Sequence, residues 1–434
     1  MGARETALNV LIACRKEDGW SNGMLKEYIR RDKLDRRDAA LATRLCYGVV
    51  QNRLKLDFYL QQLLTGKLKD LHPAVRDILH LGMYQLLEMD KVPDSAAVNE
   101  SVDLAKKYCK KQRYAPGLVN AVLRKATTQQ LKQPTGWQET YSHPQALIDL
   151  LKPYVGKRME KMLQANNEAP DTVVQVNTLR TTQQALLERL EGEGVTAKPH
   201  GWMENCLVLS GIGNLEQLPA FRDGWFYVQD PAAKLSVLCA QIPKGSRVLD
   251  CCAAPGGKSF AAAMAMEGTG SITSCDVYAH KAELIANGAA RLGITNLTAL
   301  QQDATAHVTQ WENNMDVVIT DVPCSGLGII RKKPDIRYKN LKELEALPAL
   351  QRAIFENAAT YVRPGGLLLY ATCTLVRAEN EGVVEDFLRT HPAFSLEKLP
   401  LPSVFPENET GMLALVPGEF DTDGFFIARL RRNQ

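Results

Sequence analysis

The stretch LDCCAAPGGKS (249–259) joins a short apolar strand to the start of a helix through a loop of small residues. Small and glycine residues after a strand let the backbone approach a ligand closely, and the N-terminus of the following helix offers free N–H groups. A P-loop would need glycine where Cys252 stands, and the dinucleotide fingerprint GxGxxG is absent. The stretch therefore predicts a nucleotide-type site that lacks a complete phosphate-binding motif.

Strand-like and helical segments alternate from Ala232 to the end of the chain. Alternation of this kind is typical of a doubly wound parallel sheet, in which ligands bind beyond the carboxyl ends of the strands. We therefore predict an α/β, Rossmann-like domain over residues 236–434. Its expected strands are 246–253, 271–277, 297–304, 316–323, 366–373 and 424–432, and its expected helices include 279–293, 347–362 and 379–391.

The preceding residues predict two further domains. Residues 1–135 show helical periodicity without strand-like runs, and we predict an all-helical domain there. Residues 140–235 combine strand-like runs with one helical run, which indicates a small α+β module. The expected strands of this module are 172–180, 206–211 and 224–230, and its expected helix is 181–194.

Composition limits the kind of protein that this chain can be. Of its 434 residues, 45% are hydrophobic and 23% are charged. No stretch approaches the roughly 18 apolar residues of a membrane span, so we expect a soluble protein without membrane contact. Its ten cysteines form no CxxC pair and no Cys/His cluster of metal spacing, which favours reduced thiols in a cytoplasmic protein without bound metal.

The net charge of +3 hides an asymmetry between the two ends of the chain. Residues 1–135 carry 24 Lys and Arg against 15 Asp and Glu, and the remainder of the chain is acidic. A basic excess of this kind suits a phosphate-rich partner. Lysines on exposed helices also serve solubility alone, and the charge pattern does not separate the two interpretations.

Two acidic residues follow the strands that come after the glycine loop. Asp276 lies at the end of the second expected strand and Asp303 at the end of the third. A carboxylate in the first position suits the two hydroxyls of a ribose, and one in the second could accept the amino group of an adenine. Because no phosphate cradle is complete, we predict an adenosine ligand without phosphates, S-adenosylmethionine. The simpler interpretation is that both residues merely start loops.

Five motifs of the chain together resemble those of the RNA cytosine-C5 methyltransferases. They are LDCCAAPGGKS, DVPCSG (321–326), RKKPDI (331–336), YATCT (370–374) and DGFF (423–426). With a NusB-like helical domain in front, the whole chain resembles the bacterial RsmB (Sun/Fmu) family, which methylates cytosine 967 of 16S rRNA. The resemblance implies this activity, a class I S-adenosylmethionine-dependent methyltransferase fold, and 16S rRNA as the partner. We expect the enzyme to be a monomer.

The chemistry explains why such an enzyme would need two thiols at strand ends, Cys324 and Cys373. Carbon 5 of cytosine is too weak a nucleophile to attack a methyl sulfonium, but addition of a thiolate to carbon 6 turns the ring into an enamine that can. A base must then remove the carbon 5 proton so that the thiolate can leave. This chemistry does not say which cysteine adds. The resemblance implies that Cys373 is the nucleophile and that Cys324 assists product release.

The resemblance also implies the residues that bind cofactor and RNA. Asp321 would lie beside cofactor and target base, where its carboxylate could bind the methionine end or the cytosine edge. Arg331, Lys332 and Lys333 are candidates for gripping RNA phosphates, although adjacent basic residues usually form a solvated loop. The predicted cofactor-binding residues are Cys252, Ala253, Ala254, Pro255, Gly256, Gly257, Lys258, Asp276, Asp303 and Asp321.

Three other functions stay open at this point. The catalytic motifs also fit a sister enzyme that acts on tRNA or on another rRNA site. A non-catalytic RNA-binding factor would explain the NusB-like helices, but not the two cysteines and the cofactor loop. A P-loop ATPase is disfavoured by the missing glycine at Cys252. The chain departs from the family motifs at Cys251, Val322 and Lys333, and none of these departures removes a proposed catalytic group.

Overall fold

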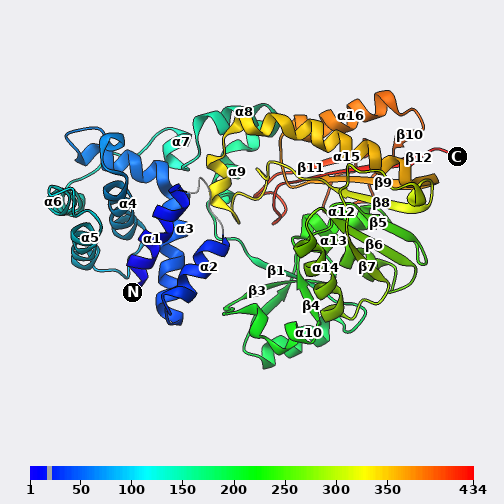
Figure 1. The fold of residues 1–434 in the computed structure, drawn as a ribbon, viewed down its shortest axis with the longest axis horizontal. Coiled ribbons are helices and arrows are strands. Elements are labelled where there is room, and N and C mark those ends of the chain that lie inside the picture. The colour runs from blue at the N-terminus through cyan, green and yellow to red at the C-terminus, as the bar shows by residue number, and fades with distance from the viewer. Residues whose placement is uncertain (17–21) are drawn as a thin grey trace. The chain divides into compact units, whose positions relative to one another are not determined.

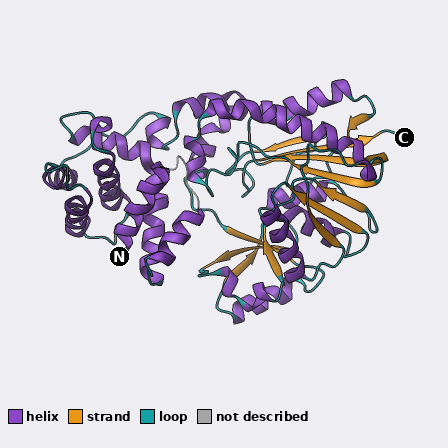
Figure 2. Cartoon of the chain, viewed as in Figure 1, coloured by secondary structure: helices purple, strands orange, loops and turns teal. Residues whose placement is uncertain are grey.

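The computed structural model describes residues 1–16 and 22–434 and divides into two compact units. The helical unit comprises residues 1–150 and 333–339, and the sheet unit comprises residues 151–332 and 340–434. Figure 1 follows the chain from end to end, and Figure 2 separates helices from strands. The predicted domain boundaries, 1–135, 140–235 and 236–434, stay predictions.

The helical unit is built around long amphipathic helices whose ends carry recognisable signals. Asp35 caps the longest helix by accepting a hydrogen bond from the N–H of Asp38, and Pro73 is the first residue of α4. A Cβ added at Gly82 of α4 would lie 2.4 Å from the Leu123 side chain, so glycine lets α4 and α6 approach closely. The helices are α1 Ala3–Lys16, α2 Asn22–Arg31, α3 Arg36–Leu63, α4 Pro73–Glu88, α5 Asp94–Tyr108, α6 Ala115–Thr128, α7 Trp137–Thr140 and α8 Gln145–Val155.

Segment 333–339 belongs to the helical unit although the surrounding sequence belongs to the sheet unit. Arg337 is almost fully buried there, and its guanidinium donates hydrogen bonds to the carbonyls of Gln51 (2.9 Å) and Ser142 (3.0 Å). The Tyr338 hydroxyl donates to the carbonyl of Val50. Burial lowers the pKa of Arg337 to about 10. The segment is therefore part of the packed interior of the helical unit.

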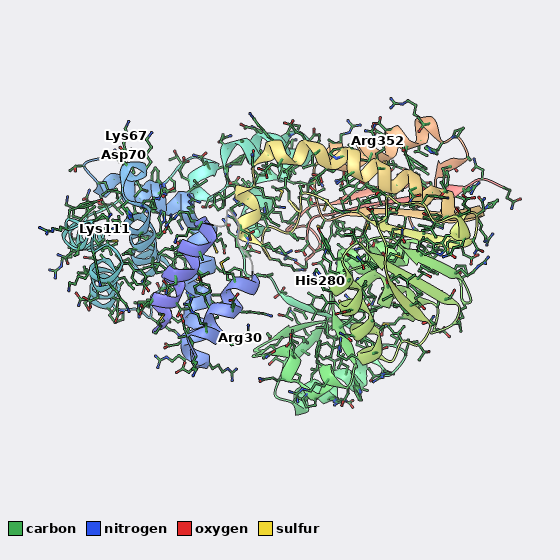
Figure 3. All side chains as sticks on the ribbon, viewed as in Figure 1. Arg30, Lys67, Asp70, Lys111, His280 and Arg352 are labelled. Carbon is green, nitrogen blue, oxygen red and sulfur yellow. The ribbon has the colours of Figure 1, made fainter. Side chains whose placement is uncertain are left out.

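Several basic side chains lie on the outside of the helical unit. Arg30, Lys67 and Lys111, which Figure 3 labels, are all exposed. Among the helices that the structure describes, none is both long and apolar enough to cross a membrane.

A four-stranded antiparallel sheet forms the first part of the sheet unit. Its strand order is β2-β3-β1-β4, and α10 packs on it through buried side chains such as Leu186 and Leu190, which meet Val174 and Phe226. The predicted module is therefore present, and β2 is a strand that the sequence pattern did not predict. The elements are α9 Met159–Ala165, β1 Thr172–Val176, α10 Gln183–Gly192, β2 Thr196–Pro199, β3 Cys206–Ser210, α11 Pro219–Arg222 and β4 Phe226–Val228.

An eight-stranded mixed sheet forms the rest of the sheet unit. Its order is β10-β12-β9-β8-β5-β6-β7, with β11 beside β12, and the five strands from β9 to β7 are parallel. The C-terminal strands β10, β11 and β12 pair antiparallel, so the predicted parallel sheet is mixed at this edge. The strands are β5 Arg247–Asp250, β6 Ser271–Asp276, β7 Leu297–Gln301, β8 Met315–Asp321, β9 Val362–Thr372, β10 Phe394–Leu396, β11 Met412–Leu415 and β12 Phe425–Arg432.

Helices cover both faces of this sheet, as Figure 1 shows. Alternate residues of β8 point to opposite faces: Val317 and Ile319 join the core beneath α12–α14, and Val318 joins the core beneath α15 and α16. The chain runs from β5 outward to β6 and β7 on one side, and returns through β8 and β9 on the other. The switch point between β5 and β8 is where such sheets bind ligands. The helices are α12 Pro231–Cys239, α13 Gly257–Ala265, α14 Ala279–Leu292, α15 Leu347–Tyr361 and α16 Glu381–Thr390.

Candidate active site

Two cysteines meet at the carboxyl ends of the neighbouring parallel strands β8 and β9. Because Asp321 of β8 lies opposite Ala371 of β9, the residues that follow these strands emerge side by side. The Sγ atoms of Cys324 and Cys373 are 3.3 Å apart, and both side chains are half-buried. The hydrogen bond to Cys373, followed by burial, raises the pKa of Cys324. The structure thus brings together the two thiols that the sequence singled out.

Two glycines let the loop after β8 lie directly against Cys373. The N–H of Gly328 donates to the Cys373 carbonyl (2.9 Å), and the N–H of Gly424 donates to the Gly328 carbonyl (2.8 Å). A Cβ added at Gly328 would lie 2.1 Å from the Gly424 oxygen, so no larger residue fits without a shift of backbone. The DGFF motif is therefore part of the packing around the thiols.

The loop between β5 and α13 carries most of the predicted cofactor-binding residues. Gly256 adopts φ +109°, which favours glycine, and a Cβ there would collide with the ring of Phe260. Lys258 is buried, and its Nζ lies 2.5 Å from the Asp321 carboxylate, whose side chain is 31% exposed. The ion pair joins the cofactor loop to Asp321 at the end of β8, three residues before Cys324. Cys252, Ala253, Ala254 and Pro255 lie in the loop after β5, and Gly257 is the first residue of α13.

Asp250 is a buried carboxylate that the sequence analysis missed. It ends β5 with no exposed surface, and its Oδ2 accepts a hydrogen bond from the Ser259 hydroxyl, which lies 2.7 Å from the Ser274 hydroxyl. Burial raises the pKa of Asp250 to about 7. The chain of hydroxyls ties the start of the cofactor loop to α13 and β6. An acidic residue directly before the Cys-Cys pair in LDCC was the signal that could have found it.

Asp276 and Asp303 follow the strands β6 and β7, on the other side of β5 from the thiols. Asp276 is nearly buried, and its Oδ1 accepts a hydrogen bond from the N–H of Tyr278 and lies 3.7 Å from Lys281 Nζ. Asp303 is exposed, and its Oδ1 accepts hydrogen bonds from the N–H and hydroxyl of Thr305. These bonds lower the pKa of Asp303. Both carboxylates are at the strand ends that the sequence predicted, in very different surroundings.

Two of the three residues predicted to grip RNA form ion pairs inside the sheet unit. Lys332 Nζ lies 2.5 Å from Asp423 and 2.9 Å from Asp230, and Arg331 Nε lies 2.7 Å from Asp423. Both carboxylates have less than a tenth of their side chains exposed. Binding of RNA phosphates would compete with these bonds, and the RNA role of Arg331 and Lys332 stays a prediction. Lys333 is exposed.

Comparisons with known proteins assign the chain to a family. Family models match three segments: 16S rRNA methyltransferase RsmB/F over residues 238–431, the NusB family over 1–128, and an RsmF/B-like ferredoxin-like domain over 143–216. The chain is 34% identical to the probable ribosomal RNA small subunit methyltransferase B of Bacillus subtilis, over 99% of this chain and 98% of that protein. This chain belongs to the ribosomal RNA small subunit methyltransferase B family.

Further relatives of the methyltransferase B family agree with this assignment. The ribosomal RNA small subunit methyltransferase B of Pseudomonas putida is 31% identical over 99% of this chain and 98% of that one. The crystal structure of PH0851 has a TM-score of 0.82 and 26% identity over 99% of both chains. A methyltransferase homologue from Pyrococcus horikoshii has a TM-score of 0.59 and 25% identity over 68% of this chain and 97% of that one. The predicted family and fold class are confirmed, with the middle module as a ferredoxin-like domain.

Proposed function

We propose that this chain methylates carbon 5 of a cytosine in RNA with S-adenosylmethionine, through a covalent bond between Cys373 and carbon 6 of the base. The observation that carries the proposal is the 3.3 Å separation of the two thiols at the ends of β8 and β9. Beside them, the Lys258–Asp321 ion pair links the thiol loop to the cofactor loop. Membership of a family of ribosomal RNA methyltransferases supports the substrate class.

The thiol pair supports an order of deprotonation. The hydrogen bond to Cys373 raises the pKa of Cys324, because a proton on Cys324 is held between the two sulfurs. We propose that Cys373 reacts as the thiolate while Cys324 keeps its proton. The Cys373 thiolate attacks carbon 6 of cytosine, the electron pair of the 5,6 double bond moves toward the ring nitrogen, and carbon 5 becomes nucleophilic.

Release from the covalent intermediate needs a base near carbon 5. Once the Cys373 sulfur is bonded to carbon 6 it carries no charge, so the electrostatic effect that keeps the Cys324 proton in place disappears. The Cys324 thiol then gives its proton to water, and the resulting Cys324 thiolate takes the carbon 5 proton. The electrons of that C–H bond re-form the 5,6 double bond, and the Cys373 thiolate leaves. We propose Cys324 as the group that assists this step.

The residues around the switch point fit an adenosine cofactor. We propose that Asp276, nearly buried at the end of β6, binds the ribose hydroxyls, and that Asp303, which follows β7, binds the adenine amino group. Gly256 has a positive φ and directly precedes α13. The loop backbone therefore reaches the N-terminus of this helix without the bulk of a side chain. When bound, S-adenosylmethionine supplies an electrophilic methyl group. We propose that residues 252–258 hold its methionine portion near Asp321.

The proposed substrate is cytosine 967 of 16S rRNA. The family model and the curated relatives carry the small-subunit rRNA in their names, and this supports the choice over tRNA. A base must leave its stack to reach a thiol at the end of a sheet. Exposed basic residues of the helical unit suit the sugar-phosphate backbone of such a substrate.

A gel experiment tests the proposal. The wild type, Cys324→Ala and Cys373→Ala are incubated with methyl-labelled S-adenosylmethionine and either 16S rRNA transcript or tRNA, and are separated on a denaturing protein gel. We expect Cys324→Ala to retain a slowly migrating labelled adduct, and Cys373→Ala to give neither adduct nor methylated RNA. Methylation by Cys373→Ala would overturn the assignment of the nucleophile. Transfer of label by wild type to tRNA but not to 16S rRNA would overturn the substrate.

A further inference from the structure

The chain turns back on itself after Cys373, and this turn buries two polar residues beside both thiols. Glu379 ends the short helical turn Arg377–Glu379, Asn380 follows it, and each has 1% of its surface exposed. A carboxylate and an amide are costly to bury unless hydrogen bonds satisfy them. Their side chains bond to residues that flank Cys324 and Cys373 and to Gln351 of α15, and each of the two residues serves one cysteine.

Glu379 holds the peptide next to Cys324. Its Oε2 accepts a hydrogen bond from the N–H of Ser325 (2.8 Å) and a second from the side-chain amide of Gln351 (2.9 Å). That amide of Gln351 also donates to the carbonyl of Pro323 (2.9 Å). The peptides on both sides of Cys324 are therefore fixed by one buried carboxylate and one buried amide. The backbone carbonyl of Glu379 is itself anchored by the hydroxyl of Tyr370 (2.6 Å).

Asn380 holds the residues on either side of Cys373. Its Oδ1 accepts a hydrogen bond from the Thr372 hydroxyl (2.6 Å), and its Nδ2 donates to the Thr374 carbonyl (3.0 Å). Thr372 and Thr374 are fully buried, so these bonds are shielded from water. A contact between the hydroxyls of Ser325 and Thr374 (2.7 Å) joins the two sets.

We propose that Glu379 is a positioning residue for product release and that Asn380 is a positioning residue for adduct formation. The inference rests on the proposed roles of Cys324 and Cys373. In this arrangement Glu379 fixes where the Cys324 sulfur lies relative to carbon 5, and Asn380 fixes the direction from which the Cys373 sulfur approaches carbon 6. Each residue acts through the hydrogen bonds that it makes to the peptides flanking its thiol. Loss of each should therefore impair the one chemical step that depends on its thiol.

The assay that follows the covalent adduct separates the two roles. Glu379→Ala removes the acceptor for Ser325 and Gln351, and we expect methylated adduct to persist as in Cys324→Ala, with release slowed about tenfold for the loss of roughly one net buried hydrogen bond. Asn380→Ala removes both bonds beside Cys373, and we expect adduct formation itself to slow about tenfold while release from adduct is unchanged. A defect confined to folding would instead lower both rates together.

Conservative and independent variants guard against misfolding. Glu379→Gln can keep an oxygen in the position of Oε2, so release should be close to wild type. Gln351 of α15 bonds to the same loop, and Gln351→Ala should slow release on its own. Thr372→Val removes the Asn380 bond with little change of shape and should slow adduct formation. Thr320→Val is the matched control, because this buried hydroxyl donates to the Leu369 carbonyl of the same strand pair without touching either thiol loop. It should change neither rate.

Reference variants on the same gel separate failure of this inference from failure of the proposed function. If Cys324→Ala accumulates adduct but Glu379→Ala and Gln351→Ala release product at the wild-type rate, the role of Glu379 is wrong. If Glu379→Ala and Asn380→Ala slow the same step, the division between them is wrong. If Cys324→Ala itself accumulates no adduct, the proposed thiol roles fail, and the inference about positioning falls with them.

Discussion

The two halves of the site, on either side of β5, are organised differently. At the ends of β8 and β9 the thiols lie within a buried network in which Glu379 and Asn380 fix the neighbouring peptides. At the ends of β6 and β7 one carboxylate is nearly buried, and the other, Asp303, is exposed and bonded only to its own turn among the contacts that the structure shows. The comparison indicates that the thiol half is set before substrate binds, while the adenosine half depends on single side chains. Preorganised groups contribute most to the transition state, and peripheral contacts contribute mainly to binding.

The largest expected effect is at the thiol half. Cys373→Ser replaces the proposed nucleophile with a hydroxyl that is almost never ionised near neutral pH, and we expect methylation to fall by on the order of a thousandfold or more. The affinity for S-adenosylmethionine, measured by calorimetric titration, should stay within about twofold, because the serine does not touch the cofactor loop. If the affinity for S-adenosylmethionine fell as much as the methylation rate, the thiol half and the adenosine half would not act independently.

Asp250 gives the next largest effect, on the pH dependence of stability. Burial raises the pKa of Asp250 from 3.8 to about 7. Between about pH 4 and about pH 7 the folded chain therefore keeps a proton on Asp250 that the unfolded chain has lost. The contribution of Asp250 to stability falls as pH rises from about 4 to about 7. Asp250→Asn cannot titrate and should remove this decline. The unfolding equilibrium constant is measured with urea at pH 5 and at pH 8. Between these two pH values it should rise at least about tenfold more for wild type than for Asp250→Asn. Equal pH dependence in both would contradict the buried protonated carboxyl.

Asp276→Ala should weaken the adenosine half more than the thiol half. The nearly buried carboxylate is proposed to accept both ribose hydroxyls, and its loss should raise the Kd for S-adenosylmethionine about tenfold or more. At saturating cofactor, the rate of adduct formation should return close to wild type. A rate that stays low at saturation would show that Asp276 also shapes the thiol half.

Asp303→Ala should have the smallest effect. Its carboxylate is exposed, and water competes for any bond it makes to adenine, so we expect the Kd to rise by about threefold or less. The control is Glu283→Ala, an exposed acidic residue of α14 outside the strand ends, which should leave the Kd unchanged. If Asp303→Ala raised the Kd as much as Asp276→Ala does, exposure would not decide how much each carboxylate contributes to cofactor binding.

Those features of the fold that depend on local pattern could be predicted from the sequence. The alternation of strands and helices indicated the sheet, and the parallel neighbours β8 and β9 necessarily bring Cys324 and Cys373 together once both end strands. The short strand β2 and the antiparallel edge strands β10 and β11 were not predicted, because their few residues carry little periodicity. Strand pairing of that kind is decided by long-range contacts.

Those features of the site that depend on distant partners could not be predicted. The ion pairs of Arg331 and Lys332 join residues about a hundred positions apart, and nothing in a run of basic residues reveals their acidic partners. Glu379 and Asn380 read as the polar start of a helix, and only burial shows that they hold the thiol loops. Likewise, Arg337 lies in a segment with basic neighbours, and its burial in the helical unit follows from packing alone.

The most direct test of the central claim is to identify the cysteine that is bonded to RNA. Cys324→Ala is incubated with 16S rRNA transcript and S-adenosylmethionine, the adduct is digested with trypsin and nuclease, and the modified peptide is sequenced by mass spectrometry. Trypsin cleaves after Arg352 and Arg377, and Cys373 is the one cysteine of the resulting peptide, so the attachment site can be assigned. We predict a methylated cytidine on the peptide that contains Cys373. An RNA-free Cys373 peptide, with the nucleotide attached at another residue, would contradict the account.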